Sequence, residues 1–190
     1  MPELNLLVLP DTDTAINTDS KAFLTDNIAN NTVLDYNILC PMYSRFMGLM
    51  YPIYREEGTP ILGLGNGALI LAADLGCKLY DFVAGHSDKY HRVGIAGQNN
   101  ETSVYSNHIQ AIANLGPNVE TLAHAVDKSG VYYMPEAFKA KNAPIAGILW
   151  KPDVIANTMT SANYETTRHM IGDPISFNII KSLLNGTLNL

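Results

Sequence analysis

A stretch of apolar and glycine residues in the first half of the chain has the pattern of a nucleophile elbow, the strand-turn-helix unit that presents a catalytic side chain. Residues 60–73 read PILGLGNGALILAA. The first apolar run predicts a buried strand, the Gly-Asn-Gly a sharp turn, and the second apolar run a helix packed on the sheet. In an elbow the middle residue of the turn carries the nucleophile beside the amides of a helix N-terminus. That residue is Gly65, so the hydroxyl or thiol that covalent catalysis requires is missing.

Two other interpretations of this turn stay open on its residues alone, an ordinary glycine-rich turn and a nucleotide-binding loop. Gly63, Gly65 and Gly67 lack the wider spacing of a Rossmann fingerprint, and no Gly-Lys-Ser/Thr follows them as in a P-loop. Glycine at the middle position also relieves a backbone strain of about 1–3 kcal/mol, because positive φ costs it almost nothing.

Cysteines and histidines supply the other reactive side chains. Cys40 and Cys77 lack the paired spacing of a zinc site or a redox dithiol, and we interpret both as buried free thiols. Cys40 is the one alternative nucleophile, since it ends a predicted strand, and the carboxyl ends of strands face the active site in open α/β sheets. The spacing of His86, His91 and His108 matches no standard zinc pattern, so we expect no metal site.

Alternating strands and helices must position the elbow. Apolar runs predict strands over 4–10 and 35–41, and helical spacing predicts helices over 21–28, 46–55 and, at the end of the chain, 173–185. After residue 93 the segments become shorter and richer in turn residues. There we predict strands over 93–95, 120–125, 130–134 and 144–150, a short helix over 109–115, and a polar loop over 88–92. This order indicates an α/β sandwich.

Composition limits the classes of partner. The 190 residues are 47% hydrophobic, which is typical of one globular domain, and we assign residues 1–190 to it. A net charge of -6 with only 12 Lys and Arg argues against nucleic acid as the main partner. The sequence has no signal-peptide pattern and no apolar run long enough to span a bilayer, so we expect a soluble, cytoplasmic protein without a membrane partner.

Three segments share motifs with one enzyme family. Residues 60–67 read PILGLGNG against a family elbow of Pro-Val-Leu-Gly-Ile-Cys-x-Gly, and residues 104–112 read VYSNHIQAI against Val-Asn-Ser-x-His-x-Gln-Ala-Ile. Residues 147–153 read GILWKPD against Gly-Val-Gln-Trp-His-Pro-Glu. On these residues the chain resembles the class I glutamine amidotransferases, most closely their gamma-glutamyl hydrolase-like branch. The resemblance implies an α/β fold: a three-layer sandwich with a mostly parallel central sheet, of the flavodoxin-like class I glutamine amidotransferase type, plus a small antiparallel region.

The same alignment implies that the family's catalytic residues are replaced. Its nucleophilic cysteine falls on Gly65, its catalytic histidine on Lys151 and its catalytic glutamate on Asp153. A Pro-Gly-Gly loop that helps to form the family's oxyanion hole falls near residues 41–43, where Met42 and Tyr43 stand in place of the glycines. A lysine ammonium, with an ordinary pKa of about 10.4, cannot act as a base at pH 7 unless it is strongly desolvated.

We therefore expect a pseudoenzyme, an amidotransferase-like protein without catalytic activity or cofactor that serves as a binding, regulatory or structural subunit. The vestigial site positions are Gly65, Lys151 and Asp153, and the candidate ligand-binding residues are Met42, Tyr43, Gly63, Asn66, His108 and Lys151. The expected partner is another protein subunit, such as a synthetase or ligase, a larger assembly such as a virus particle, or a second copy of the chain. One alternative is a hydrolase or amidotransferase with altered chemistry, which would use Lys151, Asp153 or Cys40. The other is a sensor in which Lys151 holds a small anionic ligand.

Overall fold

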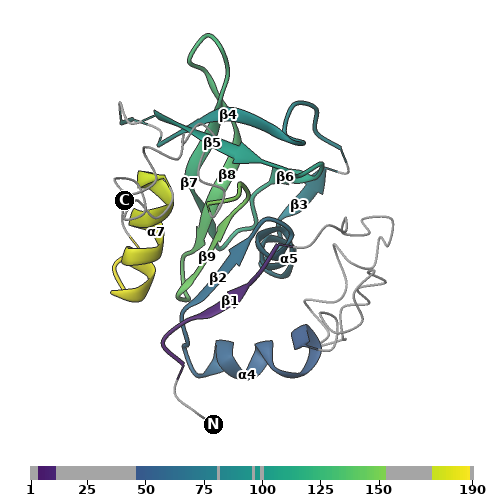
Figure 1. Ribbon diagram of the computed structural model, residues 1–190. Coiled ribbons are helices and arrows are strands. Elements are labelled where there is room, and N and C mark those ends of the chain that lie inside the picture. The colour runs from purple at the N-terminus through teal and green to yellow at the C-terminus, as the bar shows by residue number, and fades with distance from the viewer. Residues whose placement is uncertain are drawn as a thin grey trace, which may run out of the picture.

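A seven-stranded sheet forms the frame of the protein (Figure 1). The computed structural model describes residues 4–11, 46–80, 82–95, 97–98, 101–152 and 173–188. Its strands, in spatial order, are β1 (Leu7–Leu9), β2 (Ile61–Leu64), β9 (Ile145–Ile148), β8 (Tyr132–Ala140), β7 (Val119–Val126), β4 (Lys89–Gly94) and β5 (Glu101–Ser106). A second sheet pairs β3 (Lys78–Tyr80) with β6 (Ala111–Asn114). The helices are α4 (Tyr51–Glu56), α5 (Asn66–Asp74) and α7 (Pro174–Leu184), and residues 46–49 just before α4 are helical as well.

The large sheet has a parallel half and an antiparallel half. β2 runs parallel to both β1 and β9, whereas β8 is antiparallel to β9 and β7, and β4 is antiparallel to β7 and β5. The expected α/β fold class is confirmed, but the antiparallel part is larger than the small region we expected from the sequence. The reason lies in the short connections, because strands joined by tight turns, such as β7 and β8 at residues 127–131, pair as hairpins.

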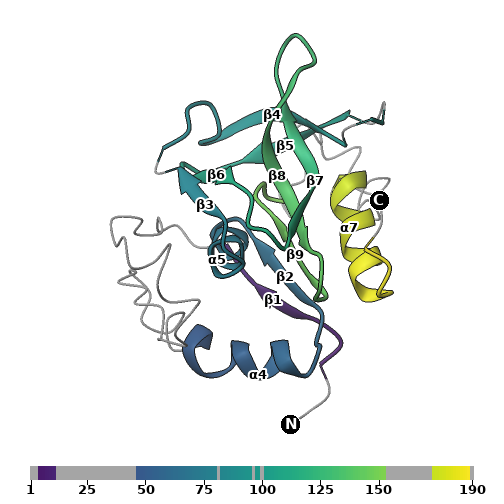
Figure 2. The same ribbon diagram turned by 180° about the vertical axis from the view of Figure 1, so that it is seen from behind.

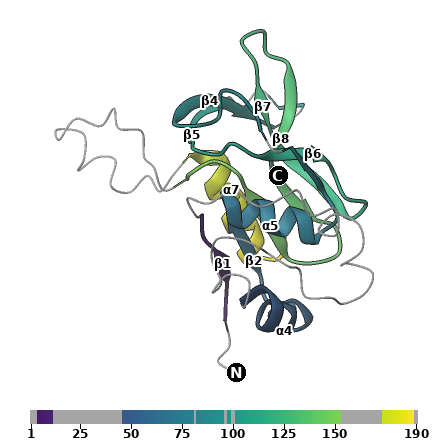
Figure 3. The ribbon, with the colours of Figure 1, turned by 90° about the vertical axis from the view of Figure 1, so that its right-hand side faces the viewer.

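Helices cover the two faces of the parallel half. Ile61 packs in the same apolar cluster as the buried residues of α5, while its neighbour Leu62 packs with Ile175 and Ile179 of α7. This alternation follows from the two-residue period of a strand. In Figures 1 and 2 α5 and α7 accordingly lie on opposite sides of the sheet, and the side view in Figure 3 draws α5 in front of α7. Within the described part of the chain, no helix combines the length and the apolar character needed to cross a bilayer.

Most of the predicted elements are confirmed and two are wrong. The predictions over 4–10, 46–55, 60–64, 120–125, 130–134, 144–150 and 173–185 correspond to β1, α4, β2, β7, β8, β9 and α7. The helix predicted over 109–115 is instead β6, because pairing with β3 decides the conformation of a short apolar run that fits either pattern. The predicted polar loop over 88–92 is mostly β4, which carries polar residues on a solvated face while both of its edges are paired. The predictions over 21–28 and 35–41 lie outside the described residues.

Candidate functional site

The turn between β2 and α5 has the sharp geometry expected of an elbow. Gly65 adopts φ 53° and ψ −119°, and its N–H donates to the carbonyl of Ile148 at 2.8 Å. Only glycine adopts such a backbone conformation at little cost. The flanking glycines permit close approach: a Cβ on Gly67 would lie 2.2 Å from the Leu9 carbonyl oxygen, and one on Gly63 would lie 2.6 Å from the Ala68 Cα. The strand and the helix therefore meet through glycine backbone.

Asp11, which directly follows the β1 region, fills the space above Gly65. Its Oδ1 accepts a hydrogen bond from the backbone N–H of Asn66, the first residue of α5, at 2.8 Å. A Cβ built on Gly65 would lie only 2.2 Å from the same oxygen. The carboxylate thus occupies the volume in which a side chain at position 65 would begin. A negative group at this place is stabilised by the helix dipole and by the N–H groups of the first turn.

Lys151 is the second partner of Asp11. Its Nζ lies 3.2 Å from Asp11 Oδ2, and both side chains are 22% exposed. The backbone N–H of Lys151 donates to the Tyr105 carbonyl at 2.9 Å, which fixes the start of the segment after β9. Asp11, after β1, and Lys151, after β9, therefore form an ion pair within the chain, above the elbow. Chemically, this arrangement offers a paired ammonium and a paired carboxylate beside a glycine, without a nucleophile at position 65.

The structure brings together only part of the predicted site. Gly65, Asn66 and Lys151 surround Asp11, and Gly63 lies beneath them at the crossing of strand and helix. Sequence analysis missed Asp11, whose only local signal is an acidic residue directly after a buried strand. The remaining predicted positions, Cys40, Met42, Tyr43 and Asp153, lie outside the described residues.

His108 takes part in a different cluster. It is joined there by His86, which precedes β4, by His91 of β4 and by Glu136 of β8. Glu136 is completely buried, and its carboxylate oxygens lie 3.1 Å from His86 Nδ1, 3.4 Å from His108 Nε2 and 3.8 Å from His91 Nε2. We call these residues the His/Glu cluster.

Burial and mutual contacts shift the pKa values of the His/Glu cluster. Burial raises the pKa of Glu136, but the contacts with His108 and His86 outweigh it and lower the pKa to about 2. Burial lowers the pKa of His91. Burial also lowers the pKa of His108, but the contact with Glu136 and the charge of Asp11 outweigh burial, so the pKa of His108 is raised overall. The cluster and Lys151 also share the end of β5, because Ser106 Oγ contacts His91 Nε2 at 2.7 Å and the Tyr105 carbonyl accepts from the Lys151 N–H.

The three histidines were considered together in the sequence, where their spacing predicted no metal site, but Glu136 was missed. The local signal of Glu136 is a carboxylate inside a strand whose next residues are Ala137 and Phe138. Burying a charge without a partner is costly, so a glutamate in an apolar strand indicates nearby cationic or ligand groups. The polar residues of the family-like segment 104–112 are explained in the same way, since Ser106 and His108 are buried and bond within this region.

Cys77 is buried and forms no disulfide, as expected. Its Sγ accepts a hydrogen bond from the Gly116 N–H at 3.2 Å, and burial raises the pKa of the thiol. A raised pKa lowers the thiolate fraction at neutral pH, so this residue is a poor nucleophile.

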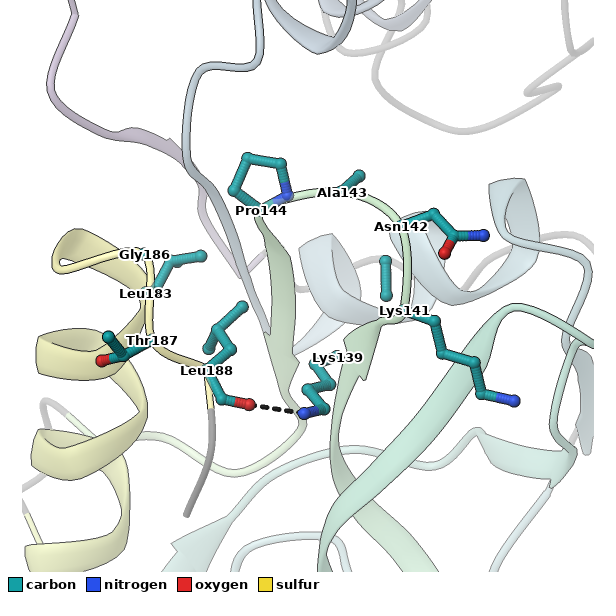
Figure 4. Close-up of a pocket in the computed structure, with 10 residues that line it drawn as sticks. Lys139, Lys141, Asn142, Ala143, Pro144, Leu183, Gly186, Thr187 and Leu188 are labelled. Atoms are coloured by element: carbon teal, nitrogen blue, oxygen red, sulfur yellow. Dashed lines mark hydrogen bonds between the residues drawn. The ribbon is translucent and has the colours of Figure 1, made fainter.

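A hollow elsewhere on the molecule lies apart from these residues (Figure 4). It is lined by the end of β8 and the β8–β9 connection, residues 139–144, and by Leu183 of α7 and residues 186–188 after it. Lys139 Nζ donates to the Leu188 carbonyl at 2.5 Å and lies 3.3 Å from Glu120 Oε2. The hollow is at the start of β9, whereas Lys151 follows the end of that strand, so it lies apart from the Asp11–Lys151 pair.

Comparison with known proteins identifies the fold. No protein-family model matches the sequence, and no curated protein matches it. A solved structure from Thermoplasma acidophilum, described as a candidate GMP synthase component, is similar with a TM-score of 0.52 and 21% identity, over 95% of this chain and 77% of that chain. A glutamine amidotransferase from Thermotoga maritima has a TM-score of 0.48 and 17% identity, over 79% and 74% of the two chains. One from Methylobacillus flagellatus has a TM-score of 0.49 and 15% identity, over 63% and 48%.

The first of these similarities shows the fold and not the activity. The chain therefore has a glutamine amidotransferase-like α/β fold, as the sequence predicts.

Proposed function

We propose that this chain is a catalytically inactive member of the amidotransferase fold group, related to the gamma-glutamyl hydrolase-like branch. The observation that supports this most directly is the position of Asp11. Its carboxylate overlaps the place where a Cβ at position 65 would lie and pairs with Lys151, which stands at the family's histidine position. Cysteine-histidine catalysis needs a thiolate, an imidazole base and space for the substrate carbonyl between them.

An altered chemistry is harder to support at the same place. Lys151 is held by Asp11 at 3.2 Å, and a carboxylate already accepts the Asn66 N–H at the start of α5. A small anionic ligand would have to displace this internal carboxylate from both of its partners. The internal pair thus performs the task that a bound anion performs at other helix N-termini.

A non-catalytic domain of this fold acts through binding, in a regulatory or structural role. The Thermoplasma acidophilum structure with a similar fold is described as one component of a synthase. We propose a comparable docking role here, with another protein chain, a larger assembly or a second copy of this chain as the partner.

Turnover and labelling assays test the loss of catalysis. We expect no release of ammonia or glutamate from glutamine or γ-glutamyl peptides, and no covalent labelling by a chloroketone glutamine analogue. Turnover that disappears in Lys151→Ala and persists in Lys141→Ala would overturn the proposal. Lys141 is a matched control because its Nζ donates to the Pro117 carbonyl on the β8–β9 side of the molecule.

A further inference from the structure

The His/Glu cluster has the composition of a metal site. One ligand atom from each of His86, His91, His108 and Glu136 lies within 4.8 Å of all the others. The His86, His108 and Glu136 side chains are at most 2% exposed, and that of His91 is 11% exposed. Imidazole nitrogen combined with carboxylate oxygen is a donor set that suits divalent first-row metals, Zn²⁺ among them.

Each imidazole is held from its outer side. His108 Nδ1 lies 2.8 Å from the Gln110 carbonyl, and His91 Nδ1 lies 3.1 Å from the Arg92 carbonyl. Carbonyls only accept, so these nitrogens carry the hydrogen, and in the neutral form of each ring Nε2 is the atom with the lone pair. His86 Nε2 lies 3.0 Å from the Tyr133 hydroxyl and can donate to it, which leaves Nδ1 as the inner atom. Fixing the outer nitrogen in this way is how proteins orient histidine ligands.

The inner atoms lack suitable partners among the described residues. His86 Nδ1, His108 Nε2 and both Glu136 oxygens are fully buried and form no well-aligned hydrogen bond, although nitrogen and oxygen approach to 3.1 and 3.4 Å. Buried polar atoms without hydrogen bonds are costly, and an unpaired buried carboxylate is more so. Two groups resolve this arrangement: a proton on the imidazole nitrogens, or a metal ion that all of the inner atoms bind.

We propose that His86, His91, His108 and Glu136 bind one divalent first-row transition-metal ion of the zinc class. In a tetrahedral site with metal–nitrogen bonds of about 2.0–2.1 Å, neighbouring ligand atoms lie about 3.3 Å apart. His86 Nδ1 lies 3.1 Å from Glu136 Oε1, and His108 Nε2 and His91 Nε2 lie 3.4 and 3.8 Å from Oε2. Since the four ligand atoms spread over as much as 4.8 Å, metal binding draws them closer together. Four protein ligands close the coordination shell, which is typical of structural rather than catalytic zinc.

His91 is the ligand that must adjust. Its Nε2 accepts a hydrogen bond from Ser106 Oγ at 2.7 Å, and it is the most distant of the three nitrogens from Glu136. Metal binding replaces this hydrogen bond, and the serine hydroxyl then turns to another acceptor. Removing the hydroxyl therefore leaves metal binding intact or strengthens it.

The site joins segments that are separate in the sequence. His86 and His91 flank the start of β4, His108 lies between β5 and β6, and Glu136 lies on β8. The backbone also links two of these segments, because the His108 N–H donates to the His86 carbonyl at 3.0 Å. A bound ion would lock the antiparallel half of the sheet beside the Asp11–Lys151 pair.

Metal content and unfolding test the proposal on the intact wild-type chain. We expect one zinc per chain after equilibration with zinc and passage through a desalting column, measured by elemental analysis and native mass spectrometry. At free zinc 100 times the dissociation constant, the unfolding equilibrium shifts about 100-fold toward the folded state. A chain that retains no zinc, and whose unfolding is the same in zinc and in EDTA, would overturn the proposal and leave a cluster held by protons alone.

Four variants locate the ion. Glu136→Gln preserves side-chain volume but removes the carboxylate charge, and we expect at least a tenfold loss of zinc affinity, with a similar loss in His108→Ala. His124→Ala removes a histidine outside the cluster and Ser106→Ala removes the competing hydroxyl, so both retain one zinc per chain. Cobalt spectra report the site independently of stability, since Co²⁺ in a four-ligand site absorbs strongly in the visible range. Equal zinc binding in Glu136→Gln, His108→Ala and wild type would place the ion elsewhere and refute the assignment.

Discussion

Gly65 and Asp11 share one small volume at the start of α5. The carboxylate caps the helix through the Asn66 N–H and pairs with Lys151, while position 65 has no side chain. The two residues are therefore mutually dependent: any side chain at position 65 displaces Asp11, and Asp11 excludes any side chain there. At the scale of single residues, introducing a nucleophile at position 65 takes more than one substitution.

We predict that Gly65→Ala lowers the free energy of unfolding by about 2–6 kcal/mol, because the strained backbone and the forced overlap each cost about 1–3 kcal/mol. In an Asp11→Ala background the overlap is gone and the cost falls by about 1–3 kcal/mol. Urea unfolding of the four proteins in this double-mutant cycle measures the coupling.

Gly58→Ala serves as the control for that cycle. Gly58 also has positive φ, +71°, but a Cβ there would meet nothing within 4 Å. Its substitution should cost the same with and without Asp11. If Gly65→Ala were equally costly in both backgrounds, Asp11 would not be the group that fills the site.

At the scale of elements, a hydrogen-bonded group joins the start of α7 to the sheet, in addition to the apolar packing of Ile175 and Ile179. Asp173 caps the helix by accepting from the Ser176 N–H at 2.8 Å, and its other oxygen accepts from Trp150 Nε1 at 2.8 Å. Trp150 directly follows the β9 region, precedes Lys151 and is fully buried. The family-like tryptophan therefore fixes both the helix and the segment that carries Lys151.

We predict that Asp173→Ala lowers the free energy of unfolding by about 1–2 kcal/mol, since a helix cap is worth about 1 kcal/mol and the indole N–H keeps only the Ser176 hydroxyl, at 2.8 Å, as its acceptor. Asp173→Asn keeps an oxygen for the cap and should cost less. Trp150 is the only tryptophan in the chain, so its fluorescence reports its surroundings without interference. An unchanged emission spectrum and unchanged stability in Asp173→Ala would contradict this role.

At the scale of the whole molecule, the sequence predicted the parts that depend on local pattern. Apolar periodicity predicts the strand and helix of the elbow at 60–73, the closing helix and most strands, and the glycines predict the turn of the elbow. It did not predict the contacts that join distant segments. Asp11 reaches Asn66 across 55 positions, and no local pattern of one chain records such a pairing. The His/Glu cluster escaped for the same reason, since standard zinc patterns describe ligands close in sequence, whereas these ligands come from separate strands and loops.

The division of the sheet leads to a last prediction, which rests on the proposed metal site. All four proposed ligands lie in or beside the antiparallel half, while β1, β2 and α7 belong to the parallel half. Amides that exchange by local opening report the stability of their own region. We predict that zinc slows hydrogen exchange in β4, in β8 and in residues 107–110, and leaves the locally opening amides of β1 and α7 unchanged. Glu136→Gln should remove this difference. Equal slowing of exchange in both halves, or slowing confined to the parallel half, would contradict the prediction that zinc stabilises the antiparallel half alone.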